Sequence, residues 1–99
     1  MYVVMNKLTV APEGAATLEA GFAHSGERMR QTPGCVNFEL LREEQTEGND
    51  VYMVITQWQD KDAFLAWTQS DAFRRAHSGS GDSGAMGELH MYVSVVDSR

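Results

Sequence analysis

An α+β domain with the element order β-α-β-β-α-β is the fold that this 99-residue sequence predicts. Three observations predict it: short apolar segments rich in β-branched residues, one long stretch with helical spacing, and turn residues between them. An apolar fraction of 42% and a charged fraction of 22% are typical of a soluble globular protein. Residues 1–99 are long enough to bury a core without disulfides, so we expect a single domain.

The first half of the chain predicts a strand, a helix and a second strand. Residues 2–10 form a strand because β-branched and apolar residues dominate them, and Pro12 ends it. In residues 15–30 apolar side chains recur at intervals of four and seven, which is the spacing of an amphipathic helix. A Pro-Gly pair ends this helix, and alternating apolar residues predict a strand over residues 35–43.

The second half predicts a hairpin loop, a strand, two short helices, a loop rich in Ser and Gly, and a last strand. In this order they cover residues 44–50, 51–59, 61–67, 70–77, 78–87 and 88–96. Asp60 and Ser70 are suitable N-caps for the two helices. The complete order is that of a ferredoxin-like α+β sandwich, in which helices cover one face of a four-stranded sheet.

The predicted strands carry apolar residues on both faces. In the last strand, Leu89, Met91 and Val93 point to one side, whereas Tyr92 and Val96 point to the other. Such a sheet requires cover on both faces, and the predicted helices are too few to supply it. We therefore expect a homodimer, in which two sheets pack face to face to form a dimeric α+β barrel.

Composition and motifs exclude several classes of function. The net charge of −6 argues against a nucleic-acid partner, because phosphate binding needs a basic surface. Cys35 is the only cysteine, which excludes an internal disulfide and a CxxC site. The sequence has no apolar run that could span a membrane, so we expect no membrane partner and a cytoplasmic protein. It also lacks the motifs of a P-loop, a Ser-His-Asp triad and an HExxH helix.

Three residues are candidates for a ligand site. Asn6 lies on the more apolar side of its strand, where its amide either bonds to nearby backbone or points into a polar cavity. Trp67 follows Phe64 by three positions, as expected for a buried helical stripe or for a bulky ligand wall. His77 ends the last short helix, where it is a capping or solvated residue or an axial ligand to iron. The Ser/Gly-rich loop after His77 is a candidate lid.

On a chain of this element order, Asn6, Trp67 and His77 resemble the haem-degrading monooxygenases of the antibiotic biosynthesis monooxygenase superfamily. The resemblance covers nearly the whole chain. It is strongest in Asn6-Lys-Leu-Thr-Val10, the Pro33-Gly34 turn, Trp58 at the end of the third strand, and Ala63-Phe64-x-x-Trp67-x-x-Ser70-Asp71-x-Phe73-x-x-Ala76-His77. The superfamily fold hosts several chemistries, so the three residues together carry the resemblance to the haem-degrading branch.

The resemblance implies that haem is both the substrate and the cofactor that activates dioxygen. His77 then binds the haem iron, Asn6 donates an amide hydrogen bond beside dioxygen, and Trp67 presses the porphyrin out of plane. Phe22 is implied as a further residue of the haem pocket. The implied reaction opens the porphyrin to a linear tetrapyrrole and releases iron, with electrons from an external reductant through a reductase.

One departure from the family pattern concerns the haem propionates. Related enzymes often have an Arg directly before the Phe of the first helix and another basic residue one turn later. Here these positions are Gly21 and Ser25. The propionate contacts then come from Arg28, from Arg30 or from loop backbone, or the propionates face solvent.

Other functions fit the same residues. In a cofactor-free monooxygenase of the same fold, Asn6 and Trp67 line a pocket for a quinol or polyketide, and His77 acts as a base. A haem-binding carrier or sensor uses the same pocket without turnover. In a dimeric domain without a ligand, the three residues serve only packing.

Overall fold

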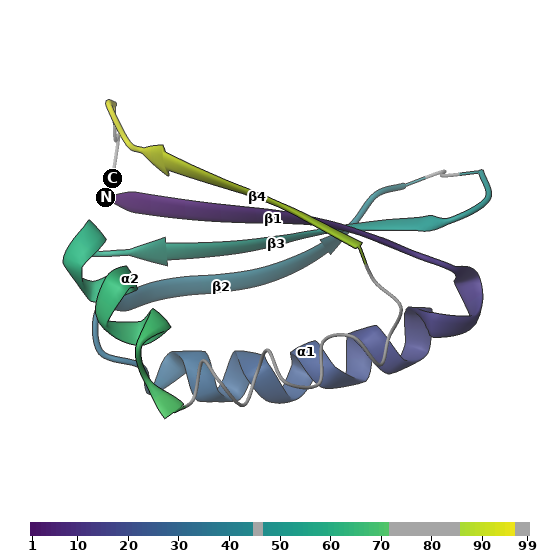
Figure 1. The fold of residues 1–99 in the computed structure, drawn as a ribbon, viewed down its shortest axis with the longest axis horizontal. Helices are drawn as coiled ribbons and strands as arrows, with labels where there is room; N and C mark the ends of the chain where they lie inside the picture. Colours follow the sequence, from purple (N-terminus) through teal and green to yellow (C-terminus); the bar gives the residue numbers. More distant parts are fainter. Residues whose placement is uncertain (45–46, 72–85, 97–99) are drawn as a thin grey trace.

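The computed structural model describes residues 1–44, 47–71 and 86–96, which form one antiparallel sheet with helices packed on one face (Figure 1). The elements are β1 (Tyr2–Val10), the 3-10 turn η1 (Pro12–Gly14), α1 (Ala15–Arg30), β2 (Cys35–Arg42), β3 (Asp50–Trp58), α2 (Lys61–Thr68) and β4 (Met86–Val93). The four strands lie in the order β2-β3-β1-β4, and every neighbouring pair is antiparallel. The predicted ferredoxin-like α+β fold is confirmed.

The predicted bounds are confirmed for β1 and α1, and those of β2, β3 and α2 are correct to within one residue at each end. The prediction for the last strand is wrong at both ends. β4 begins at Met86, inside the predicted loop, because its pairing with β1 reaches Thr9. It ends at Val93, three residues earlier than predicted, because Val93 already faces Tyr2, the first residue of β1. Beyond this pair, β1 offers no further strand residue to pair with.

The core lies between the sheet and the helices, and it is divided into two clusters. One cluster contains Tyr2, Val4, Met29, Trp58 and Phe64, and the other contains Leu8, Val10, Leu18, Tyr52 and Val54. β1 contributes its even-numbered residues to both clusters because successive side chains in a strand point to opposite faces. Trp58 is completely buried, and its indole Nε1 donates a hydrogen bond to Thr56 Oγ1 at 3.0 Å. Its one polar group is therefore satisfied inside the core.

The turn between α1 and β2 determines how closely α2 can approach. Gly34 has a φ of +81°, a left-handed conformation that favours glycine. A Cβ at this position would overlap the Cβ of Ala63 in α2. α2 itself begins after Asp60, whose Oδ1 accepts a hydrogen bond from the Ala63 backbone N–H at 2.8 Å. The predicted N-cap is confirmed, and the glycine at this turn allows α2 to lie against the end of the sheet.

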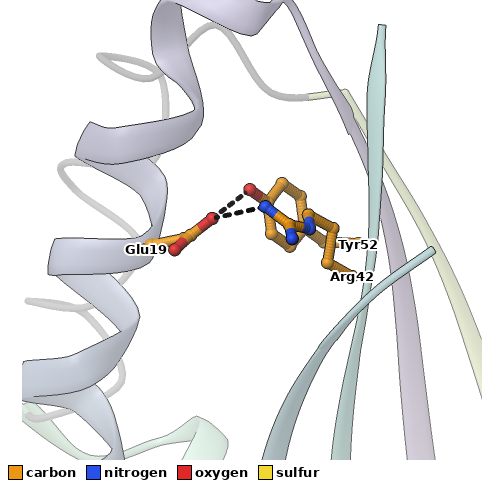
Figure 2. A network of polar contacts seen from close by, with 3 residues as sticks. All are labelled: Glu19, Arg42 and Tyr52. Carbon is orange, nitrogen blue, oxygen red and sulfur yellow. Dashed lines mark hydrogen bonds and ion pairs between the residues drawn. The ribbon is translucent and has the colours of Figure 1, made fainter. Parts of the chain in front are cut away.

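α1 is fixed over β2 and β3. Phe22 stacks with Phe38 of β2, with ring centroids 6.3 Å apart. Helix and strand approach closely here, because a Cβ at Gly26 would lie 3.4 Å from Phe38 Cδ1. Near the start of α1, the Tyr52 hydroxyl of β3 donates a hydrogen bond to Glu19 at 2.5 Å (Figure 2). Aromatic stacking and one polar contact thus hold α1 on this side of the sheet.

α2 packs on β3, and β4 receives no comparable cover from the helices described. The centroid of the Trp58 ring lies 5.7 Å from that of Phe64 and 5.5 Å from that of Trp67. β4 forms the border of the sheet opposite β2, away from α1 (Figure 1). In the described ranges, neither helix has the length and apolar character needed to cross a membrane. The two described helices therefore cover the β2–β3 half of the sheet, and neither of them covers the border at β4.

Candidate functional site

An apolar surface on β4 faces the helix side of the sheet without a described helix above it. Tyr2 and Val4 point into the core, and they face Val93 and Met91 in the register between β1 and β4. Directly paired residues share a face, so Val93, Met91 and likewise Leu89 project to the helix side. Their side chains are 69%, 50% and 56% exposed, respectively. We call Leu89, Met91 and Val93 the shelf.

Asn6 lies beside the shelf, at the point where the core is divided. Its neighbours on the same face, Val4 and Leu8, belong to different core clusters, and its partner on β4 is Leu89. Asn6 is half-buried, and its amide has no hydrogen-bond partner among the described residues. The described residues thus offer no hydrogen bond to nearby backbone, the first of the two interpretations of Asn6, and the second, an amide that points into a polar cavity, stays a prediction. An amide without such a partner can donate to a ligand resting on the shelf.

Trp67 borders the same region from α2. It is half-buried and packs against the cluster that contains Tyr2 and Val4, whose partners on β4 are shelf residues. Its ring contacts Trp58 and also Phe64, with a centroid distance of 6.2 Å to the latter. Trp67 is thus a packed residue with an exposed part. An aromatic wall supported in this way cannot easily yield to a ligand.

The remaining predicted site residues are placed differently or not at all. His77 lies outside the described residues, as do the predicted helix end and most of the Ser/Gly-rich loop around it. Phe22 is half-buried, stacks with Phe38 of β2 and packs against the core cluster that contains Leu8 and Tyr52. Its proposed contact with haem stays a prediction. The described residues contain no group of three His, Cys, Asp or Glu side chains that could hold a metal ion.

A groove of about 850 Å³ between α1 and β2 was not anticipated from the sequence. It is lined by Glu19, Phe22, Ala23, Gly26, Glu27, Met29, Arg30, Cys35, Val36, Asn37, Phe38, Leu40, Arg42 and Tyr52. Neither Asn6 nor Trp67 contributes to it. The groove and the shelf are therefore separate features, on the two sides of α1.

Three of the residues that line the groove, Glu19, Arg42 and Tyr52, form a polar network (Figure 2). The Tyr52 hydroxyl donates to Glu19 Oε2, and Arg42 Nη1 lies 4.0 Å from the same oxygen. Burial, followed by the hydrogen bond and the negative charge of Glu19, raises the pKa of Tyr52 to about 12. Burial also raises the pKa of the Cys35 thiol, which keeps it protonated and unsuited to act as a nucleophile. The described groove residues thus present an anchored helix and no activated nucleophile.

The sequence showed that the shelf residues are apolar and share a face, but it did not show which face of the sheet they lie on. Apolar residues on both faces of the predicted strands, with Leu89, Met91 and Val93 on one side of the last strand, were expected to indicate cover by a second subunit. In the structure the shelf side chains lie on the helix side, so two sheets packed through their open faces would leave them uncovered. A second subunit packed on the open face of the sheet therefore does not account for these three apolar side chains. The Tyr52–Glu19 contact had no signal, because 33 residues separate its partners.

Comparisons with known proteins show which proteins this chain is similar to. Residues 1–79 match the family model described as antibiotic biosynthesis monooxygenase. A haem oxygenase (mycobilin-producing) of Mycobacterium tuberculosis is 35% identical over 77 residues, which cover 78% of this chain and 70% of that protein. A haem oxygenase (staphylobilin-producing) of Staphylococcus saprophyticus is 29% identical over 101 residues, covering 97% of this chain and 96% of that protein.

One solved structure adds a ligand to the comparison. A mutant of MhuD with two manganese protoporphyrin IX molecules bound per active site superposes with a TM-score of 0.78. It is 30% identical to this chain, and the match covers 98% of this chain and 97% of that one. The resemblance therefore extends over the complete fold, including the strand that carries the shelf.

Proposed function

Because this chain belongs to the antibiotic biosynthesis monooxygenase family, we propose that it is a haem-degrading monooxygenase that holds its substrate over the shelf. The observation that carries this proposal is the exposed apolar shelf beside Asn6, whose amide has no partner among the described residues. Two relatives that are named as haem oxygenases, 35% and 29% identical to this chain, support the proposal. An apolar surface and one free donor suit a large flat ligand that is mostly apolar.

The proposal assigns a separate role to the shelf, to Asn6, to Trp67 and to His77. The shelf removes water from one face of the porphyrin and binds it through apolar burial. Asn6 donates its amide N–H to an oxygen of the bound reactants and so orients them. Trp67, supported by Trp58 and Phe64, would resist displacement and press against a bound macrocycle. His77 is the proposed ligand to the haem iron. The predicted contact of Phe22 with haem is not part of this proposal, because Phe22 lines the groove.

The redox chemistry belongs to the substrate. When bound, haem supplies the iron that activates dioxygen, and electrons come from an external reductant delivered by a reductase. We propose that the ring opens to a linear tetrapyrrole and that iron is released. The protein supplies a dry apolar surface, one donor and a rigid wall. We further propose that the protein acts in the cytoplasm.

We propose a homodimer formed through the sheet face opposite the helices. This open face carries apolar side chains of β1 and β3 that are only half-buried in a single chain: Val3, Met5, Val51, Met53 and Ile55. Ile55 pairs with Met5 near the middle of the face. An Ile55→Glu change would place a charge there, and we expect sedimentation to detect monomers of this variant and dimers of the parent protein. A parent protein that sediments as a monomer contradicts the dimer.

Haemin titration of the purified protein tests the enzymatic function. We expect a shifted Soret band at saturation, followed by its bleaching when ascorbate is added under air with catalase present. Catalase removes free peroxide, which bleaches haem without an enzyme. His77→Ala should abolish the bleaching. His90→Ala is the matched control, because His90 faces Met5 and lies on the opposite face of β4 from the shelf.

The outcomes separate the competing functions. A stable Soret band after reduction identifies a haem carrier and contradicts the monooxygenase. Absence of specific binding contradicts both and favours a cofactor-free monooxygenase that acts on a quinol or polyketide. Loss of activity in His90→Ala to the same extent as in His77→Ala would remove the assigned role of His77.

A further inference from the structure

The two flanks of α1 differ in charge. Successive residues of an α-helix are rotated by about 100°, and Leu18 and Met29 mark the direction that points into the core. One flank of the helix, to one side of these core residues, faces β2 and lines the groove. Both acidic residues of α1, Glu19 and Glu27, line this groove, together with Arg30. The acidic charge of the helix is thus gathered on the side away from the shelf.

The opposite flank carries positive charge and no carboxylate. Gly21, Ser25 and Arg28 follow one another at intervals of four and three, so they form one strip along the helix. None of them lines the groove. Because α1 presents its other flank to β2, this strip is turned toward the half of the sheet that carries Asn6 and the shelf. An anionic group over the shelf meets the strip without passing a carboxylate of α1.

The strip has room for a ligand. A Cβ at Gly21 would meet no atom of the described residues within 4 Å, so none of them fills the space above it. The hydroxyl of Ser25 donates to the Gly21 carbonyl oxygen at 3.2 Å and therefore folds back onto the helix. Arg28 is the long side chain of the strip. It is exposed, and its guanidinium has no ion-pair or hydrogen-bond partner among the described residues.

We propose that Arg28 binds a carboxylate of the substrate held over the shelf and is the residue by which this site selects an anionic porphyrin. This inference rests on the proposed function, since it assumes a ligand that carries carboxylates. A guanidinium presents paired donors that match both oxygens of a carboxylate. The net charge of −6 repels an anionic ligand, so the binding of its carboxylates requires a local cation such as Arg28. Arg30 and Arg42 line the groove and serve the other flank.

The test compares Arg28→Gln with the matched variant Arg30→Gln, using haemin and haemin dimethyl ester as ligands in the same dilute detergent. The ester retains the macrocycle and iron but lacks the carboxylates. We expect Arg28→Gln to weaken the binding of haemin about tenfold or more and to leave the binding of the ester unchanged. Arg30→Gln should change neither affinity by more than about twofold. Circular dichroism verifies that both variants are folded.

A second variant tests the same strip by a gain of affinity. Gly21→Arg adds a cation in open space on the flank of Arg28, and we expect it to tighten the binding of haemin several-fold without affecting the ester. Gly21→Gln is its control, because it restores helix propensity without charge. An equal gain in both variants means that helix stability, rather than charge, raises affinity, and it contradicts the proposal.

The remaining outcomes distinguish this inference from the proposed function. If the parent protein binds both ligands and Arg28→Gln weakens neither, the function stands and the assignment of Arg28 is wrong. If Arg30→Gln alone weakens haemin, the carboxylates lie on the groove side of α1, and the inference is again wrong. If the parent protein binds neither ligand, the proposed function fails, and the assignment of Arg28 fails with it.

Discussion

The two halves of the helix-side face of the sheet carry similar apolar side chains but use them differently. In the packed half, over β2 and β3, helices cover the strands and Tyr52 and Trp58 are almost completely buried. In the open half, at β4, the shelf residues Leu89, Met91 and Val93 remain half or more exposed. The comparison indicates that an apolar strand face becomes a ligand surface at the point where its helix cover ends. That border is β1.

The largest expected difference between the halves is in stability. Trp58→Ala should lower the free energy of unfolding by about 3–5 kcal/mol, because it removes a fully buried ring that supports both Phe64 and Trp67. Leu89→Ala removes a side chain of the shelf and should change it by less than about 1 kcal/mol. Urea unfolding followed by circular dichroism measures both values. Equal losses would mean that the open half is part of the core.

The next effect concerns the turn that positions α2 against the packed half. Gly34→Ala combines a left-handed φ with overlap onto Ala63, so it should cost more than the roughly 1–2 kcal/mol expected from the conformation alone. Gly48→Ala is the matched control, because Gly48 has a φ of +79° but no atom of the described residues within 4 Å of its Cβ position. Thermal unfolding of the two variants gives the difference. If Gly34→Ala is no worse than Gly48→Ala, the close approach of α2 is not a constraint.

A smaller effect, visible in its pH dependence, is expected from the polar contact that anchors α1. Tyr52→Phe removes the hydrogen bond to Glu19 and should cost about 0.5–1.5 kcal/mol at neutral pH. The pKa of Tyr52 is raised to about 12 in the folded protein, from an ordinary value of about 10. The folded state thus holds this proton more tightly than the unfolded chain does. The contribution is complete below about pH 10 and is lost as the pH rises through about 12.

The measurement is the free energy of unfolding of both proteins across this alkaline range. The parent protein should lose more stability than Tyr52→Phe between about pH 10 and pH 12, so that the two curves converge. If the free energies of unfolding of the two proteins change in parallel with pH, the pKa of Tyr52 is not raised by folding, and the prediction is wrong.

The smallest effect on stability, with a large effect on activity, is expected at the border between the halves. Asn6→Leu should change the free energy of unfolding by less than about 1 kcal/mol, because the amide has no partner among the described residues to lose. The rate of haemin bleaching should fall about tenfold or more, because a donor to the bound reactants is removed. Asn37→Leu on β2 is the matched control and should retain the rate. A strongly destabilised Asn6→Leu would indicate a structural role for this amide.

Local patterns predicted much of the fold. Period-two alternation placed Asn6 on the apolar face of β1, and helical spacing gave both ends of α1. Features that depend on distant segments could not be predicted in this way. Whether the shelf is covered depends on strand order and on where the helices lie, and the end of β4 depends on where β1 begins. That Arg30 lines the groove and Arg28 does not could not be predicted either. It depends on which flank of α1 faces β2.

The central claim, that the open half is the porphyrin site, is tested most directly by methyl NMR of the protein titrated with gallium protoporphyrin IX. This diamagnetic porphyrin shifts the methyl resonances of side chains that it covers. The account predicts large shifts at Leu89, Met91 and Val93 and unchanged resonances at Val36 and Leu40, which line the groove on the other side of α1. Shifts concentrated at Val36 and Leu40, with the shelf unchanged, would contradict it.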